Sequence, residues 1–305
     1  METKLIINKD YVPRLVENLS EKDYHEDATA VNSSSLKFIF HSEKAWYNEY
    51  TKAWSPPKSE AMEFGKLIHK IVLEGPDFLK RYVIEPVFEG LTAKGEVTTS
   101  LNATSVKNKR NEWLQEQQAN DRIVCTQEEF DKARWMVDSF LEHKDAFNLI
   151  KNGKGEVSGY AANEKTGILT KARADFLSLS EGILVDLKTC VNIKQDYFLK
   201  RRVIHEDYRY DMQLALYKNV FDQYSGNSIK YVTWIVLGNQ KPYECAVYFA
   251  PKDLILAAET YYNHAMKKIS IAVKRKSFLP YQTAVQELIL PEKFSYLDEA
   301  MRIEG

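Results

Sequence analysis

Hydrophobic and polar positions change their spacing several times along the chain, and each change marks a predicted element. Helical spacing predicts five helices, over residues 32–50, 59–74, 127–142, 205–222 and 252–275. Asn32 or a following serine is the expected N-cap of the first helix, and Thr126 forms a capping box with Glu129. Residues 88–108 are polar, small and aperiodic, which predicts a mobile surface loop.

Short apolar runs bounded by turn residues predict strands in the second half of the chain. Three strands are expected over 156–163, 168–179 and 183–189, and two more over 229–238 and 243–250. This order predicts an α/β or α+β domain with a central sheet flanked by helices. No linker is evident, so we expect one domain: an entry region (1–58), a core (59–277) and a tail (278–305).

Composition narrows the function only slightly. The 305 residues carry a net charge of -1, so any nucleic-acid site must be a local basic patch. Cys125, Cys190 and Cys245 are far apart and form no CxxC pair, which argues against disulfides, a zinc ribbon or an iron–sulfur cluster. The chain begins without a signal-peptide pattern and has no run of about 18 apolar residues, so we expect a cytosolic protein and no membrane contact.

Charged residues stand inside two of the predicted strands, where burial requires a partner or a metal. They are Asp175, Asp186 and Lys188. If Glu181-Gly182 is a two-residue hairpin loop, position 175 lies opposite 188, with 186 on the same face. The three side chains then converge, although a three-residue loop would move Asp175 out of line.

Two carboxylates held together repel each other unless a cation lies between them. Mg²⁺ suits such a pair, because it binds few protein carboxylates and also takes phosphate oxygens. A lysine beside the cation can orient or deprotonate a water and offset charge on the phosphate. The pattern predicts a metal-dependent phosphodiesterase; the alternative is a buried Asp–Lys salt bridge with Asp175 at a strand end.

The pattern D-x(10)-D-L-K resembles the PD-(D/E)xK nuclease superfamily. The helix sequence GKLIH, which ends at His69, and the later QLALY, from Gln213 to Tyr217, resemble the RecB-type branch, and Glu156 opens the first strand. Over about 24–275 the layout is similar to the exodeoxyribonuclease VIII (RecE-like) phage and prophage family. Glu43 replaces a proline common there, and Cys190 a frequent threonine.

The resemblance implies a restriction-endonuclease-like fold with a mixed central sheet, and a role for each matching residue. It implies metal binding by His69, Asp175, Asp186 and the Leu187 carbonyl, with Glu156 serving a second metal or the water. Catalysis is expected from Asp175, Asp186, Lys188 and Glu156, with Tyr217 supporting Gln213. Contacts with DNA are expected from Gln213, Arg173, Ser35 and the cluster Lys200, Arg201 and Arg202, which we rank above Lys107–Arg110 and Lys274–Lys276.

The resemblance also implies an activity. Such proteins degrade linear double-stranded DNA from the 5′ end with Mg²⁺, which Mn²⁺ is expected to replace. The 3′ single strands serve a RecT-type annealing partner in a bacterial or phage-infected cell, and some members close into trimeric or tetrameric rings. Two alternatives stay open: an endonuclease or nickase on the same fold, and a catalytically silent DNA-binding module.

Overall fold

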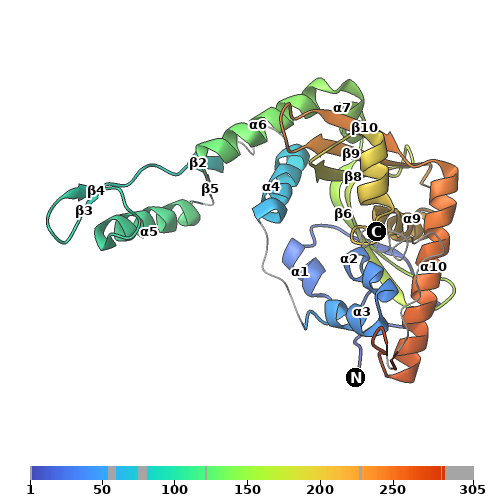
Figure 1. Cartoon of the computed structure of the whole chain (residues 1–305). Coiled ribbons are helices and arrows are strands. Elements are labelled where there is room, and N and C mark those ends of the chain that lie inside the picture. Colours follow the sequence, from blue (N-terminus) through green and yellow to red (C-terminus); the bar gives the residue numbers. More distant parts are fainter. Residues whose placement is uncertain are drawn as a thin grey trace, which may run out of the picture.

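The computed structural model describes residues 2–53, 60–74, 81–120, 122–226, 229–282 and 284–285 (Figure 1). Its strands are β1 (Arg14–Val16), β2 (Tyr82–Ile84), β3 (Gly90–Leu91), β4 (Val97–Thr98), β5 (Ile123–Cys125), β6 (Lys154–Ala162), β7 (Leu169–Ser178), β8 (Ile183–Cys190), β9 (Tyr231–Gly238) and β10 (Cys245–Phe249). The longer helices are α4 (Glu60–Glu74), α5 (Thr104–Ala119), α6 (Gln127–Glu142), α9 (Tyr210–Ser225) and α10 (Lys252–Arg275). The shorter ones are α1 (Glu21–Glu26), α2 (Ser33–Leu36), η1 (Lys37–Phe40), α3 (Glu43–Tyr50), α7 (Lys144–Lys151), α8 (Gln195–Phe198) and the π-helical turn η3 (Leu199–Val203).

A mixed sheet of six strands forms the centre of the body, in the order β1-β6-β7-β8-β9-β10. Every neighbouring pair is antiparallel except β8 and β9, which run parallel. A parallel pair needs a long crossover connection, and α9 lies in the segment that joins these two strands. The mixed sheet flanked by helices confirms the predicted fold class.

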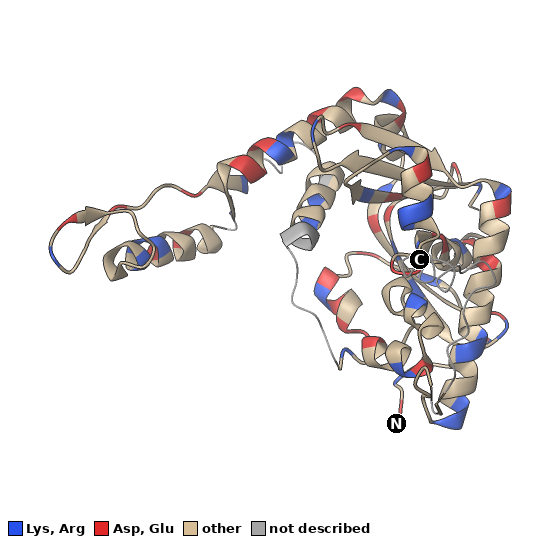
Figure 2. Ribbon diagram, in the orientation of Figure 1, with Lys and Arg blue, Asp and Glu red and all other residues tan. Residues whose placement is uncertain are grey.

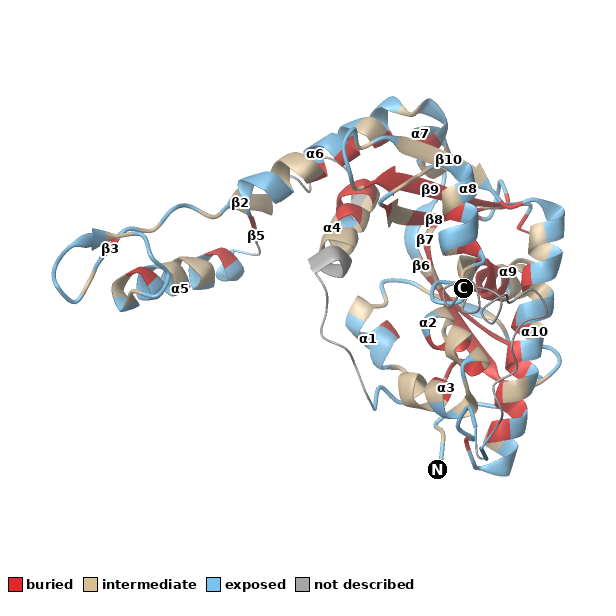
Figure 3. Ribbon diagram, in the orientation of Figure 1, coloured by how far each residue is buried: buried red, intermediate tan, exposed pale blue. Residues whose placement is uncertain are grey.

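Helices cover both faces of the sheet, and each face has its own hydrophobic core. One core joins Leu184 of β8 to α9, α10 and the N-terminal helices, and the other joins Val185 and Leu187 to α4, α6 and α7. Alternate residues of β8 therefore serve opposite cores. Figure 3 shows the buried residues concentrated on the sheet and on the inner sides of these helices.

The expected elements of the core lie within a few residues of the observed ones, and α10 matches its prediction at both ends. The capping box of Thr126 and Glu129 is confirmed, as is Asn32 as the N-cap of α2. Two helix predictions were wrong. The helix expected over 32–50 ends before Ser42, whose hydroxyl caps a new helix, α3. The helix expected from 205 begins at Tyr210, because Arg209 is left-handed (φ 48°).

The segment expected as a mobile loop is folded into an arm. Residues 85–120, here called the arm, extend from the body and contain β3, β4 and α5 (Figure 1). The Ser105 hydroxyl bonds to both backbone groups of Leu91, and Phe88 lies edge-on to Trp113. These local contacts order residues whose composition gives no helical or strand period, and so the prediction of a loop over 88–108 was wrong.

In the part of the chain that the structure describes, no helix is both long and apolar enough to cross a bilayer.

Candidate functional site

The β7–β8 hairpin brings the two aspartates together, in a register that differs from the expected one. The ladder runs from Ser178↔Ile183 to Phe176↔Val185, so the turn spans 179–182 and the two-residue loop was wrong. The next positions on the two strands are Asp175 and Asp186. Position 175 thus moves by two residues relative to its expected partner, and a shift of two keeps a side chain on the same face. The charged side chains therefore converge as expected, although the loop is longer than the expected two residues.

Asp175 is held by the helix on one side and by the neighbouring strand on the other. His69 of α4 places Nδ1 3.5 Å from its Oδ1, and the Leu187 N–H donates to its Oδ2 at 2.6 Å. Burial raises the pKa of Asp175, but the charges of His69 and Lys188 and these contacts outweigh burial and lower it. Burial likewise lowers the pKa of His69, yet the Asp175 carboxylate raises it overall.

Asp186 is the most deeply buried acid of the site, with 6% of its surface exposed. Its Oδ1 accepts hydrogen bonds from Lys188 Nζ and from Gln213 Nε2 of α9, each at 3.0 Å. Burial raises the pKa of Asp186; Lys188 opposes this rise and Asp175 adds to it, and the outcome is about 6. This carboxyl therefore changes its protonation near neutral pH, unlike a solvated aspartate.

Lys188 and Tyr217 complete the cluster on the α9 side of the sheet. Burial lowers the pKa of Lys188, but the charges of Asp186 and Tyr210 outweigh burial, so the pKa is raised and the lysine stays protonated. Burial raises the pKa of Tyr217 to about 12, and its hydroxyl contacts Gln213. Gln213 thus reaches the Asp186 carboxylate, and Tyr217 contacts Gln213 from the same helix face, as the spacing of four residues predicts.

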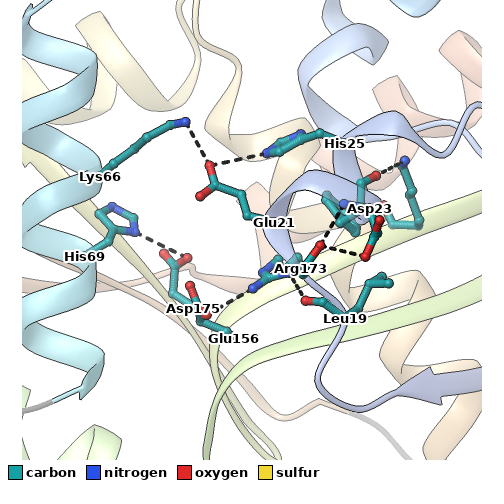
Figure 4. Close-up of polar contacts among 12 residues, drawn as sticks. Leu19, Glu21, Asp23, His25, Lys66, His69, Glu156, Arg173 and Asp175 are labelled. Carbon is teal, nitrogen blue, oxygen red and sulfur yellow. Dashed lines mark hydrogen bonds and ion pairs between the residues drawn. The ribbon is translucent and has the colours of Figure 1, made fainter. Parts of the chain in front are cut away.

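Glu156 and Arg173 lie beside this cluster and bind each other (Figure 4). Arg173 donates from Nη2 to Glu156 Oε2 at 3.0 Å and from Nη1 to the Leu19 carbonyl at 2.7 Å. Both bonds fix the guanidinium within the protein, where only 14% of the side chain is exposed. Arg173 therefore connects the N-terminal segment, which also carries Tyr24 over β7, to the edge of the site.

The sheet is distorted where these residues meet, and this distortion opens the site to both helical layers. Glu156 has a left-handed backbone (φ 52°), which is rare for a residue with a side chain. Ala174 belongs to the core under α9, whereas Phe176, two residues later, belongs to the core under α4. Regular alternation would place both on one face. Asp175 occupies the changeover, and so His69 of α4 and Gln213 of α9 approach the same pair of acids.

Among the described residues, the remaining expected DNA contacts form no hydrogen bond or ion pair with the two acids. Ser35 is 3% exposed and its hydroxyl donates to the Asn32 carbonyl, so it stabilises the first turn of α2. Lys200 pairs with Asp196, Arg201 is exposed on η3, and Arg202 stacks 4.0 Å from the centre of the Tyr208 ring. The structure places this cluster between β8 and α9, in the segment that leads back to Gln213.

Three contacts in or near this site were absent from the sequence analysis. Tyr210 holds its ring 4.5 Å from Lys188 Nζ. Arg209 forms a two-pronged ion pair with the buried Asp211, at 2.9 and 2.8 Å. Glu21 of α1 binds Lys66 of α4 at 2.8 Å and joins these helices above Asp175 (Figure 4). An aromatic residue three positions before Gln213 was the one available signal for Tyr210; long-range pairs such as Glu21–Lys66 leave no local pattern.

The donor set fits a hard divalent cation, which prefers carboxylate and carbonyl oxygens. Asp186 Oδ2 is buried and makes no hydrogen bond of suitable geometry, although Lys188 Nζ lies 2.8 Å from it. Among the described residues, no three His, Cys, Asp or Glu side chains already stand together as ligands. The contacts give the reason: Asp175 turns to His69 and Leu187, and Asp186 turns to Lys188 and Gln213.

Comparisons with known proteins agree with this geometry. Residues 32–287 match the family model of a PDDEXK-like domain of unknown function, DUF3799, and the chain belongs to that family. The fold is similar to the crystal structure of a "Putative exonuclease" from Eubacterium rectale, with a TM-score of 0.55, 16% identity, and coverage of 93% of this chain and 98% of that one. No curated protein matches the sequence. The PD-(D/E)xK fold is therefore shown, and these findings support a nuclease.

Proposed function

We propose that this member of the PDDEXK-like domain family is a divalent-metal-dependent deoxyribonuclease. The observation that carries the proposal is the buried cluster of Asp186, Lys188 and Gln213, adjacent to Asp175 and His69. Burying this many polar groups is costly unless they serve each other or a ligand. Strongly shifted pKa values beside a shared pair of acids are typical of catalytic sites.

The side chains suggest a division of roles. His69, Asp175, Asp186 and the Leu187 carbonyl would hold the cation, and Glu156 would serve a second cation or the attacking water. A bound Mg²⁺ or Mn²⁺ supplies Lewis-acid stabilisation and a more acidic water. Lys188, kept protonated beside Asp186, offsets negative charge that develops on the phosphate. Gln213 orients a phosphate oxygen or the water, and Tyr217 fixes the Gln213 amide.

We further propose the exonuclease specificity that the motif order suggests. The protein would degrade linear duplex DNA from the 5′ end and leave 3′ single strands for a RecT-type annealing protein in phage-type recombination. Closure into a ring of three or four copies would keep the enzyme on its substrate. The Eubacterium rectale protein of similar fold is described as a "Putative exonuclease", which favours this choice, whereas the fold itself is equally compatible with an endonuclease or a silent DNA-binding module.

One experiment separates these possibilities. Wild type, Asp186→Asn and Asp196→Asn are incubated with a linear duplex labelled at one 5′ end and with a covalently closed circle, in Mg²⁺ or EDTA. Asp196→Asn is the matched control, because Asp196 also pairs with a lysine but is 79% exposed on α8. We expect wild type and Asp196→Asn to digest only the linear duplex in Mg²⁺, with early release of 5′ mononucleotides, and Asp186→Asn to be inactive.

Each other result overturns a different part of the proposal. Cutting of the circle assigns an endonuclease. Retention of DNA without cleavage by wild type assigns a binding module. Equal digestion by wild type and Asp186→Asn places the catalytic site elsewhere in the molecule.

A further inference from the structure

A cavity opens beside the N-terminal end of α9, and neither of the two acids lines it. Its volume is about 450 Å³, which is within the range of small-molecule sites. Basic and aromatic side chains dominate its wall. The lining residues are Lys37, Phe40, His41, Ser42, Glu206, Arg209 and Tyr281.

Lys37 provides positive charge at this cavity. Its Nζ donates to the Asp207 carbonyl, and it forms no ion pair with any carboxylate among the described residues. Arg209, in contrast, is neutralised by its ion pair with Asp211. The carboxylates of Asp207 and Glu49 lie close enough to act on this charge, but neither forms an ion pair with Lys37, so the ammonium group can still bind an anion such as a phosphate.

Tyr281 provides an open aromatic surface at the same cavity, with 82% of the residue exposed. The segment after α10 is fixed in place: the Lys44 N–H donates to the Leu279 carbonyl at 2.9 Å, and Leu279 N–H donates to Glu43 at 2.9 Å. Phe278 stacks on Tyr47 of α3 at 4.2 Å. Tyr281 therefore stands exposed at the end of an anchored segment, where the face of its ring is open for a ligand to stack on it.

A run of aromatic and cationic side chains connects the cavity to the proposed catalytic lysine. Lys188 Nζ lies 4.5 Å from the Tyr210 ring, the Tyr210 and Tyr208 rings are 5.9 Å apart, and Lys37 Nζ lies 5.9 Å from the Tyr208 ring. Arg202 covers Tyr208 from η3. At about 3.4 Å per nucleotide, the run spans no more than about five nucleotides.

We propose that this cavity is a subsite for a nucleotide of unpaired DNA, about five nucleotides or fewer from the bond that is cut. The base stacks on Tyr281, its phosphate lies beside Lys37, and the intervening strand follows Tyr208 toward Lys188. Alternation of aromatic rings and cations is the usual way in which proteins hold a single strand without reading its sequence. The inference rests on the proposed nuclease function, because it assigns the strand that enters or leaves that site.

The test measures binding without catalysis. A fluorescent single-stranded 12-mer is titrated in EDTA against the full chain, and fluorescence anisotropy gives Kd at several salt concentrations. We expect Tyr281→Ala to weaken binding about tenfold and Tyr281→Phe to bind as wild type does, because stacking requires a ring. We expect Lys37→Ala to reduce the slope of log K against log salt by about 0.7, the value for one phosphate contact on a single strand.

Tyr224→Ala is the matched control. Tyr224 is 43% exposed, and it lies fifteen residues along the helix from Arg209, about 22 Å away at 1.5 Å per residue. Equal affinities of Tyr281→Ala, Tyr224→Ala and wild type would reject the subsite, as would an unchanged salt slope for Lys37→Ala. These binding data are independent of cleavage. If wild type cleaves DNA but the variants bind the 12-mer as tightly as wild type, the nuclease function stands and the subsite is rejected. If wild type does not cleave DNA but the variants bind more weakly as expected, the subsite stands and the nuclease function is rejected.

Discussion

The side chain of Asp186 is buried in the sheet together with the lysine that neutralises it. Such a pair gains little when intact, but removal of one partner leaves a buried charge and costs about 3–5 kcal/mol. The chain keeps both groups and adds Gln213 as a third partner for the carboxylate. Retention of a costly polar cluster in an otherwise apolar sheet is understandable if it binds a cation and a phosphodiester.

Tyr210 is expected to hold Lys188 in place through the face of its ring. Because a phenyl ring makes the same cation–π contact, Tyr210→Phe should unfold with nearly the wild-type free energy in EDTA. Tyr210→Leu removes the ring and should lose about 1–2 kcal/mol. Urea denaturation measures both variants. Equal losses would show that the hydroxyl, which both variants lack, matters at this position rather than the ring face.

Metal binding should depend on the protonation of Asp186. Its pKa in the folded protein, about 6, lies above the 3.8 of an unfolded aspartate. In EDTA the free energy of unfolding should therefore fall as pH rises from about 4 through 6, since ionisation costs more in the folded state. A cation needs the ionised form, so Mg²⁺ affinity should fall about tenfold per pH unit below 6.

Calorimetric titration of Mg²⁺ between pH 5 and 8 tests this expectation. Asp186→Asn should show no step near pH 6, and a wild-type affinity that stays constant down to pH 5 would contradict the assignment of Asp186 as a ligand.

The candidate site was predictable from sequence wherever one residue pattern carried it. Asp175, Asp186 and Lys188 were recognisable as charges inside apolar runs, and His69, Gln213 and Tyr217 through the resemblance to the RecB-type branch; the structure brings all six together. Tyr210 could not be assigned in the same way, because it lies outside the matched motifs and its contact with Lys188 joins the first turn of α9 to β8. The roles of these side chains in catalysis stay predictions.

At the scale of single elements, the strand pair β6–β7 contains the main irregularity. The left-handed backbone of Glu156 costs about 1–2 kcal/mol relative to an ordinary conformation. Strain of this kind persists where the surrounding structure demands it, and it clusters at functional sites. Here it accompanies the change of face between Ala174 and Phe176 that exposes Asp175 to both layers.

Two substitutions at Glu156 separate strain from chemistry. Glu156→Gly tolerates the positive φ, whereas Glu156→Ala keeps the strain, and both lose the carboxylate. We expect the glycine variant to be about 1 kcal/mol more stable than the alanine variant in thermal unfolding. Both variants should be less active than wild type. The opposite order of stability would mean that the strand relaxes when the side chain is removed.

Element boundaries were predictable where capping residues mark them. The predicted boundaries were wrong where a residue adopts a left-handed backbone conformation. Thr126 and Glu129 announced the start of α6. The left-handed conformation of Arg209 could not be predicted from the sequence, because glycine is the residue normally expected at a positive φ. The hairpin turn had the same difficulty: Gly182 does take a positive φ (70°), but the ladder begins only at Ser178 and Ile183.

At the scale of the whole molecule, the arm stands apart from the body. None of the hydrophobic core clusters contains a residue of 85–120. Basic side chains of the arm are partly neutralised within it, as in the two-pronged ion pair of Arg110 with Glu85. Figure 2 shows both acidic and basic residues along the arm. The folded arm could not be predicted from the sequence, because contacts between small, polar segments hold it together.

Removal of the arm should leave the body intact. Replacing residues 86–120 by a Gly/Ser linker of about eight residues should change the melting temperature of the body by no more than about 2–4 °C, since no core packing is lost. Differential scanning calorimetry gives the result. A large drop would mean that the arm contributes to the body's core despite its exposed position (Figure 3).

The bond from the Leu187 N–H to Asp175 has a consequence for hydrogen exchange. This amide sits in a strand covered on both faces, yet it donates to a side chain, at 2.6 Å. In wild type it should exchange only when the sheet opens globally, on the slowest timescale of the protein. In Asp175→Ala its acceptor is gone, and local fluctuations alone should exchange it, while the amides of Val185 and Ile235 stay protected. A single proton, followed by NMR in deuterated water, would thus report whether the two acidic strands are correctly joined, without substrate or metal.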